Sequence, residues 1–361
     1  MVRWWEASAL PEAELLAAMK HVRFAAMDAG FVQATVQAWP ALDSKEGRDI
    51  ILGSYLDAAK DNAHVLPRWG FGPRLVYVLG GKGKKNGVSL GTVDVYDPRT
   101  DAWKQLSSMP TKRRMHGGAA LGGKLYAMGG YDGGDGVLSS ADVYDPQSDQ
   151  WQPLADMASA RTELAAAAAG GKIYAIGGEN SDGDRMATAE AFDPLLGAWA
   201  EVASMSVARC LHAAAVVDGK IYVIGGMGSL GLPIGQSEVY DPQADSWQQV
   251  ASMPHPAFLH SAAAMGGKIY VTGGFELSQT NSTSSVYEYD PQADAWTQRA
   301  SMGNARRNHA SAAVGGKLDV FGGLGTGGRL STAEVYDPAS DSWAQASSLT
   351  AARRSVVAVA L

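Results

Sequence analysis

The chain has 361 residues, a formal net charge of −7 at pH 7 and one cysteine. The acidic balance argues against a general binder of nucleic acid or membrane surfaces, and a single cysteine excludes an intrachain disulfide framework. No apolar run reaches the length of about 18 residues that a transmembrane helix needs. Acidic residues come too early in the chain for the apolar core of a signal peptide. We therefore expect a cytoplasmic protein that acts as a monomer.

Residues 1–66 differ in composition from the rest of the chain and predict a small α-helical domain. They contain no glycine pair, and their apolar residues recur at helical spacing. Asp43 and Glu46 form a pattern like a capping box, which predicts the start of a further helix. The segment 67–73, PRWGFGP, is the predicted linker to a second domain. The apolar positions on the earlier helical faces are Leu15, Leu16, Met19, Val22 and Val36.

Residues 74–361 consist of a repeated unit. A Gly-Gly pair occurs six times at intervals of 48 or 49 residues, and such a period indicates one supersecondary unit laid down again and again. Short runs with period-2 alternation predict four strands in each unit. The pairs, each at the end of a second strand, are Gly80-Gly81, Gly129-Gly130, Gly177-Gly178, Gly225-Gly226, Gly273-Gly274 and Gly322-Gly323.

Three further features recur in the units. An Asp-Pro step predicts a type I turn between the third and fourth strands. The first strand is rich in small residues, which suits the innermost strand of a propeller blade, where sheets crowd toward an axis. A tryptophan stands six residues after each Asp, and its fixed place predicts packing between neighbouring sheets. The tryptophans are Trp103, Trp151, Trp199, Trp247, Trp296 and Trp343.

The two ends of the repeat region complement each other. The first unit begins at residue 74 in its second strand, and residues 353–361 read as a first strand without its second. A closed ring that joins these strands loses both exposed edges, whereas a linear solenoid has no need of the match. The predicted fold class is all-β, a six-bladed β-propeller behind a small helical domain.

The six sets of Gly-Gly, Tyr-Asp-Pro and Trp motifs resemble those of kelch-repeat β-propellers. The resemblance covers residues 74–361. Four positions depart from the pattern. Phe192 and Asp319 stand where other units have Tyr, Ala257 where others have Arg, and Gly197 where others have Asp.

The helical segment resembles the later part of the BACK domain, which precedes the propeller in BTB-kelch proteins. This resemblance implies that the protein is a substrate receptor of a cullin-3 ubiquitin ligase, a role that requires a BTB domain. No BTB domain is seen before the segment in this sequence. The residues that carry the resemblance are Leu15-Leu16, His21-Val22-Arg23-Phe24, Phe31-Val32 and Arg48-Asp49-Ile50-Ile51-Leu52.

The candidate binding surface lies where the repeat varies. One variable position, on the connections between blades, holds Arg114, Arg307 and Arg354 in three neighbouring blades. In kelch adaptors that resemble this chain, the same face holds the substrate peptide. We predict a basic arc facing an aromatic patch, which suits an acidic peptide with an apolar anchor. Solvated loop charges are the alternative. The remaining residues of the predicted surface are Lys82, Lys84, Lys85, Tyr131, Phe258, Leu259, Phe275 and Asn308.

Two other recurrent residue types are predicted to be scaffold. The residue before the variable position is almost always arginine, which predicts a structural contact between blades. Four histidines share one place on the first strand, and from four different blades they would ring a channel too wide for one metal ion. No metal or cofactor is predicted. The arginines are Arg113, Arg161, Arg209, Arg306 and Arg353, and the histidines are His116, His212, His260 and His309.

An enzyme is the alternative to a binding module. Some kelch propellers are oxidases, epimerases or specifier proteins. The oxidases require a Tyr-Cys crosslink, for which Cys210 is the one candidate, and we expect it to be a small loop residue. The glycine pairs precede loops rather than helices, so no nucleotide site is indicated. The preferred prediction is non-catalytic recognition of a protein or peptide.

Overall fold

The computed structural model describes residues 75–83, 88–134, 136–276 and 281–361. The predicted helical domain (1–66), the linker (67–73), Lys84 and Lys85 lie outside these residues. The described chain consists of strands, turns and connections. None of its segments forms a helix long and apolar enough to cross a membrane.

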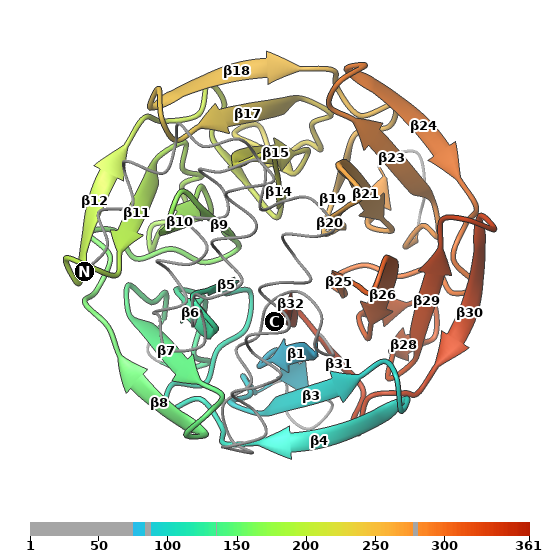
Figure 1. Ribbon diagram of the computed structural model, residues 1–361. Helices are drawn as coiled ribbons and strands as arrows, with labels where there is room; N and C mark the ends of the chain where they lie inside the picture. Colours follow the sequence, from blue (N-terminus) through green and yellow to red (C-terminus); the bar gives the residue numbers. More distant parts are fainter. Residues whose placement is uncertain (1–74, 84–87, 135, 277–280) are drawn as a thin grey trace, which may run out of the picture. The chain divides into compact units, whose positions relative to one another are not determined.

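Six four-stranded antiparallel sheets surround a central axis as the blades of a propeller (Figure 1). The strands of each blade are given from the axis outward. Blade one consists of β32 (Val357–Ala360), β1 (Val76–Leu79), β3 (Val93–Asp97) and β4 (Ala102–Leu106); blade two of β5 (Gly117–Leu121), β6 (Lys124–Met128), β7 (Ala141–Asp145) and β8 (Gln150–Pro153); and blade three of β9 (Ala165–Ala169), β10 (Lys172–Ile176), β11 (Ala189–Asp193) and β12 (Ala198–Val202). Blade four consists of β14 (Ala213–Val217), β15 (Lys220–Ile224), β17 (Ser237–Asp241) and β18 (Ser246–Val250); blade five of β20 (Ser261–Met265), β21 (Lys268–Thr272), β23 (Val286–Asp290) and β24 (Ala295–Arg299); and blade six of β25 (Ala310–Val314), β26 (Lys317–Phe321), β29 (Ala333–Asp337) and β30 (Ser342–Ala346).

Blade one joins the two ends of the repeat region. β32 pairs antiparallel with β1, so that Ala360 lies opposite Val76. Beyond this pair, Leu75 and Leu361 each donate a backbone hydrogen bond to the other's carbonyl oxygen, both at 2.9 Å. The predicted closure of a six-bladed ring by the C-terminal strand is confirmed. Closure pairs the inner edge of β1, so neither β1 nor the C-terminal strand is left without a partner strand.

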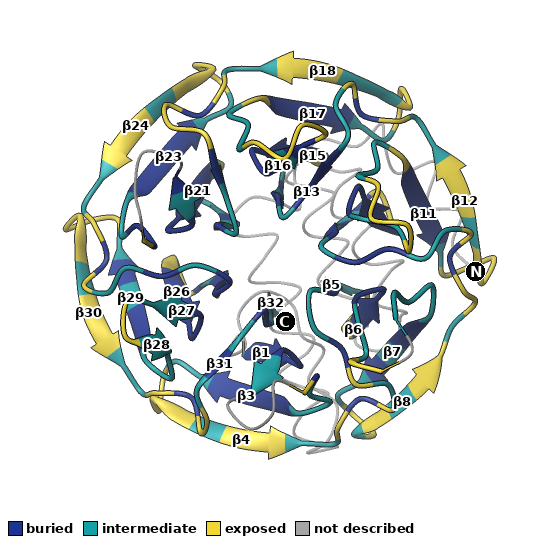
Figure 2. Cartoon of the chain, turned by 180° about the vertical axis from the view of Figure 1, so that it is seen from behind, coloured by how far each residue is buried: buried dark blue, intermediate teal, exposed yellow. Residues whose placement is uncertain are grey.

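Burial depends on the place of a strand in its blade (Figure 2). Second strands such as β10 are buried along most of their length, because a neighbouring blade covers each face. Fourth strands such as β12 are largely exposed. The inner strands crowd together, as predicted from their small residues. A Cβ atom on Gly118 in β5 would lie only 2.5 Å from Cγ1 of Val357 in β32.

The recurrent tryptophan joins each blade to the one before it. Trp151 Nε1 donates a hydrogen bond to the backbone oxygen of Ser107 at 3.0 Å. The backbone N–H of Ser107 in turn donates to Asp149 at 3.0 Å, and the hydroxyl of Tyr144 donates to the same carboxylate oxygen at 2.6 Å. We call this Tyr–Asp–Trp arrangement the blade clip. It confirms the predicted packing between sheets.

Blade three lacks part of the clip. Trp199 keeps its bond to the backbone oxygen of Ala155 at 2.9 Å. Phe192 and Gly197 stand in place of the tyrosine and the aspartate, so the two sequence departures remove both partners of one hydrogen bond. Gly197 retains the positive φ, 66°, that Asp149 and its equivalents adopt.

In five of the six blades a buried arginine ties the connection to two blades. The Arg209 guanidinium donates to the backbone oxygens of Gly225 and Gln236, at 2.9 and 2.7 Å, and to the Glu238 carboxylate at 2.7 Å. Its own backbone oxygen accepts from Gly178 of blade three at 2.9 Å. The predicted structural role is therefore confirmed. The equivalent arginines are Arg113, Arg161, Arg306 and Arg353.

In blade five Ala257 replaces this arginine and Tyr287 replaces its acid, so both members of the pair are absent. The next residue of the strand, Glu288, has other partners. Glu288 accepts hydrogen bonds from Lys268 at 2.7 Å and from Arg299 at 3.0 Å. Burial alone would raise the pKa of Glu288, but the bonds from Arg299 and Lys268 outweigh it and hold the pKa at about 2. The carboxylate thus stays ionised and paired, with cations from its own blade.

The four histidines pack between blades. Cε1 of His212 lies 2.8 Å from the place where a Cβ on Gly177 would sit, and Cβ of His212 lies 2.7 Å from the corresponding place on Gly226. Both glycines have positive φ, so any side chain there would be strained as well as crowded. Burial, followed by the charge of Arg209, holds the pKa of His212 well below its usual range. His212 is therefore a neutral packing residue. His116, His260 and His309 occupy equivalent places.

Candidate functional site

A ring of six residues surrounds the axis on the loop side of the propeller, the side that carries the connections between blades. Each has a positive φ of 51–60° and lies shortly before the first strand of its blade. Each N–H donates to the carbonyl oxygen of the equivalent residue in the preceding blade, at 2.7–3.4 Å, so six bonds close a circle. We call this circle the mouth ring. Its members are Met115, Glu163, Leu211, Leu259, Asn308 and Ser355.

One pair of facing residues from each blade lies next to the mouth ring. The first member of each pair directly precedes the ring residue, and the second directly follows the glycine pair. Antiparallel pairing puts both side chains on the same side of the local sheet. We call these the mouth pairs. They are Arg354 with Lys82, Arg114 with Tyr131, Thr162 with Glu179, Cys210 with Met227, Phe258 with Phe275, and Arg307 with Leu324, in blades one to six.

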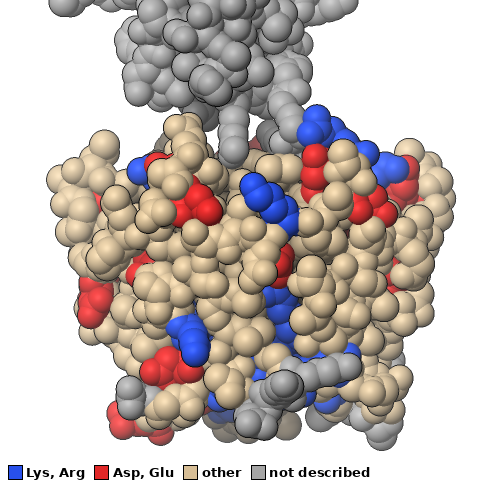
Figure 3. Space-filling view, turned by 90° about the horizontal axis from the view of Figure 1, so that it is seen from below, with Lys and Arg blue, Asp and Glu red and all other residues tan. Residues whose placement is uncertain are grey.

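Blades six, one and two form a basic sector. Arg354 in β31 (Arg353–Arg354) faces Lys82 in β2 (Lys82–Gly83). Burial lowers the pKa of Arg354, and the nearby charges of Arg329, Arg307 and Arg114 lower it further. Burial likewise lowers the pKa of Lys82, followed by Arg114, Arg354 and Arg329. The structure thus brings together the arginines that the sequence placed in neighbouring blades. The side view in Figure 3 shows basic side chains gathered along the lower edge of the propeller.

Arg329 is a member of this sector that the sequence reading missed. It lies in β28 (Gly328–Arg329), opposite Leu324 in β27 (Leu324–Gly325). Arg329 is the one charged residue of the loop LGTGGRLST. That isolated charge was a usable signal, but the equivalent loops of the blades differ in length, so the repeat did not give its register.

The aromatic side chains lie among the basic ones, which differs from the prediction of two facing patches. The guanidinium of Arg307 stands over the Phe275 ring, 5.2 Å from its centroid. Arg114 stands over Tyr131 at 4.5 Å. Phe275 in β22 (Phe275–Glu276) packs against Phe258 in β19 (Ala257–Phe258), with centroids 5.3 Å apart. Blades five and six are neighbours in the ring, so the phenylalanine pair sits beside Arg307.

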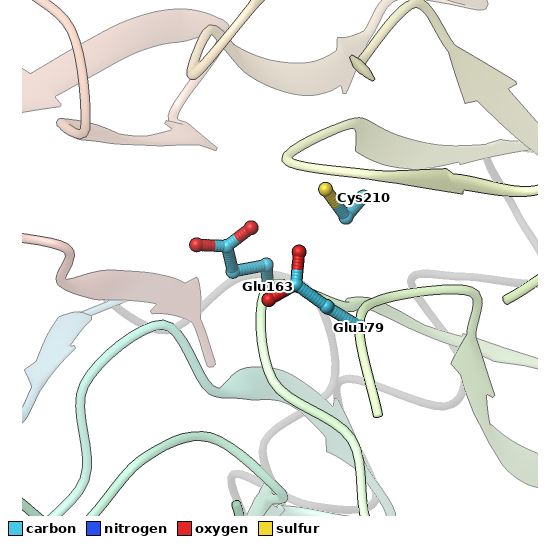
Figure 4. A group of neighbouring side chains, drawn as sticks. All are labelled: Glu163, Glu179 and Cys210. Atoms are coloured by element: carbon cyan, nitrogen blue, oxygen red, sulfur yellow. The ribbon is translucent and has the colours of Figure 1, made fainter. Parts of the chain in front are cut away.

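Blades three and four carry acidic and sulfur groups (Figure 4). Carboxylate oxygens of Glu163 and Glu179 and the thiol of Cys210 lie within 4.8 Å of one another. Arg185 faces Glu179 across the loop and donates to the sulfur of Met227 at 3.2 Å. Burial raises the pKa of Cys210 to about 12, followed by the charge of Glu163. The thiol is therefore protonated near neutral pH.

This acidic sector corrects one expectation and adds three residues, Glu163, Glu179 and Arg185. Cys210 lies in the short strand β13 (Arg209–Cys210), paired with β16 (Met227–Gly228), and is buried rather than in an open loop. Glu163 and Arg185 gave no signal in the sequence because each belongs to a position with no constant residue type. Three ligand atoms within 4.8 Å could hold a cation, but the Arg185 guanidinium already supplies positive charge beside the thiol.

A hollow of about 300 Å³ opens between the two sectors. Arg307, Arg354 and Asn308 line one part, and Glu163 lines another. Asn308 is itself buried and donates from Nδ2 to the Ser355 hydroxyl at 3.2 Å, so it supports the mouth ring. The apolar lining consists of Met115, Leu211, Phe258, Leu259 and Phe275.

Comparison with known proteins identifies relatives of the repeat region. The model of the KLHDC2/KLHL20/DRC7 Kelch-repeats domain matches residues 71–274, and the Kelch motif matches residues 256–303 and 305–350. Kelch-like protein 21 of Rattus norvegicus is 37% identical over 100 residues, which are 26% of this chain and 16% of that protein. Kelch-like protein 3 of Danio rerio is 30% identical over 125 residues, 32% of this chain and 20% of that protein. The matches thus span a fifth or less of these relatives.

A solved structure confirms the fold. The structure titled "Structure of YjhT" superposes with a TM-score of 0.64 and 16% identity, over 74% of this chain and 97% of that one. At this identity the likeness concerns the propeller fold alone.

Proposed function

The chain belongs to the Kelch-repeats domain family of KLHDC2, KLHL20 and DRC7, and from that membership we propose that it is a protein-binding module. Its loop side captures an acidic segment of a peptide or protein partner. The basic sector binds the carboxylates, and the phenylalanine pair contacts an apolar side chain of the same segment.

The observation that carries this proposal is the surplus of positive charge in the basic sector. The ion pairs among the described residues include none with Arg307, Arg329 or Arg354. The arginines of the blade interiors, by contrast, are each paired with an acid. Burial, and then the charges of nearby arginines, lower the pKa values of Arg354 and Lys82, so these cations gain stability when an anion binds. Guanidinium groups bind carboxylates with two parallel hydrogen bonds, which favours acidic side chains.

Charge reversal tests the proposal. We expect Arg307→Glu with Arg354→Glu to abolish binding of peptides that contain adjacent glutamates, measured by fluorescence anisotropy or calorimetry. The matched control is Lys104→Glu, because Lys104 is exposed on the outer strand β4. Wild-type binding should also weaken as salt rises. Binding by the double variant that equals the wild type would refute the function.

The finer proposal is that the captured partner is a substrate of a cullin-3 ubiquitin ligase. The Kelch-like relatives support it by family membership, and the propeller supplies the receptor surface. Co-precipitation of cullin-3 with the full-length gene product in cells tests this step. Capture of acidic partners without any cullin-3 would leave a binding module with a different downstream role.

A further inference from the structure

The hollow at the mouth ring carries charges of both signs. Arg307 and Arg354 line it from the basic sector, and Glu163 lines it from blade three. In Figure 4 the Glu163 side chain extends toward the central opening, while Glu179 and Cys210 stand to its side. A ligand that fills the hollow therefore meets a carboxylate as well as the arginines.

Glu163 is held in this place by the backbone rather than by an ion pair. Its φ is 57°, and its N–H donates to Met115 while its carbonyl oxygen accepts from Leu211, at 2.8 and 2.9 Å. None of the ion pairs formed within the described residues includes Glu163. The closed circle of hydrogen bonds fixes the Glu163 backbone at the hollow, and the Cys210 thiol is a hydrogen-bond partner of its side chain.

Burial raises the pKa of Glu163, and the Cys210 thiol and the Arg185 charge offset this only in part. A purely acidic ligand would bury the carboxylate further without supplying a positive charge. Binding would displace water from Glu163 and bring a second negative charge close to it, which opposes binding. A positive group on the ligand removes that penalty, since a charge pair in a partly dehydrated pocket is stronger than in bulk water. The neighbouring apolar residues Leu211 and Leu259 suit the aliphatic stem of a lysine or arginine.

We propose that the ligand is bipolar: its acidic group binds Arg307 and Arg354, and a lysine or arginine side chain of the same peptide segment binds Glu163. This inference rests on the proposed function and adds a second charge to the recognition motif. The hollow then selects against segments that are acidic throughout, so Glu163 is a specificity residue rather than a source of general affinity.

Two matched peptide libraries test the inference. Every peptide in both libraries contains a pair of glutamates and a phenylalanine at fixed positions. In the first library one lysine is placed at each remaining position in turn. In the second library a glutamine replaces that lysine. Wild-type protein should bind at least one lysine peptide about five- to tenfold more tightly than its glutamine partner. Glu163→Gln should remove that preference and leave the glutamine peptides unaffected or slightly tighter.

A control variant and the possible outcomes distinguish failure of the bipolar ligand from failure of the proposed acidic-segment function. Glu201→Gln, on the exposed strand β12, should keep the wild-type preference. Equal affinity of the two libraries for wild-type protein, or a preference that survives Glu163→Gln, overturns the bipolar ligand while glutamate binding still stands. Failure of the wild type to bind either library overturns the acidic-segment function, and the inference falls with it. Thermal unfolding of each variant verifies that the fold is intact.

Discussion

The blade clips and the mouth pairs both occupy equivalent positions in every blade, yet they differ in kind. Five of the six clips have the same tyrosine, aspartate and tryptophan, and the sixth keeps the tryptophan. No two of the six mouth pairs have the same composition. Clip residues bond one another and the backbone of the preceding blade, so the loss of one leaves its partner without a hydrogen bond. The mouth pairs differ from blade to blade without loss of the ring, and four of their residues line the hollow: Phe258, Phe275, Arg307 and Arg354.

The largest expected loss of stability comes from substituting a scaffold arginine that is of the same residue type as the arginines of the candidate site. Arg209 carries the same charge as Arg307 but is fully buried and paired with Glu238. Arg209→Ala should destabilise the propeller by about 3–5 kcal/mol, because it leaves a buried carboxylate without its partner. Urea denaturation followed by tryptophan fluorescence measures the loss. Arg307→Ala is the matched control, and an equal loss in both variants would erase the distinction between scaffold and mouth.

A second test concerns a scaffold position that departs from the repeat. Asp319 stands in β26 where other blades have a tyrosine that packs against the next blade. It is buried, and its Oδ2 has no hydrogen-bond partner among the described residues. Burial raises the pKa of Asp319 from 3.8 to about 7. The interface between the last and first blades therefore holds an acid that prefers to be protonated.

The sign of the resulting pH dependence follows from proton binding. Below pH 3.8 both folded and unfolded chains hold the proton, and between that pH and about 7 only the folded chain does. Stability should therefore fall as pH rises across this window and then level off. Asp319→Asn should flatten the profile and raise the free energy of unfolding at pH 8 by up to about 4 kcal/mol. Urea denaturation of both proteins at several pH values measures this dependence. If the free energy of unfolding of the variant changes with pH as steeply as that of the wild type, Asp319 does not titrate in this range.

The difference between clips and mouth pairs also explains which features of the fold and of the candidate site could be predicted from the sequence. The period, the ring closure and the buried arginines were predictable because scaffold contacts repeat and their residues repeat with them. The contact of Arg307 with Phe275, and the meeting of Glu163 with Glu179 and Cys210, were not. Each joins positions of different blades whose residue types occur once, and their distances depend on how the blades are set around the axis.

The smallest effect is expected from repairing the incomplete clip. Phe192→Tyr and Gly197→Asp together should restore the hydroxyl–carboxylate bond of blade three and stabilise the propeller by about 1 kcal/mol. The new aspartate would also accept from the backbone N–H of Ala155, as Asp149 accepts from Ser107. Either change alone should gain less, because a single new polar group lacks its partner, so the pair should show favourable coupling in a double-mutant cycle. Additive effects would mean that the two sequence departures arose independently, and the clip would no longer be a unit in which partners change together.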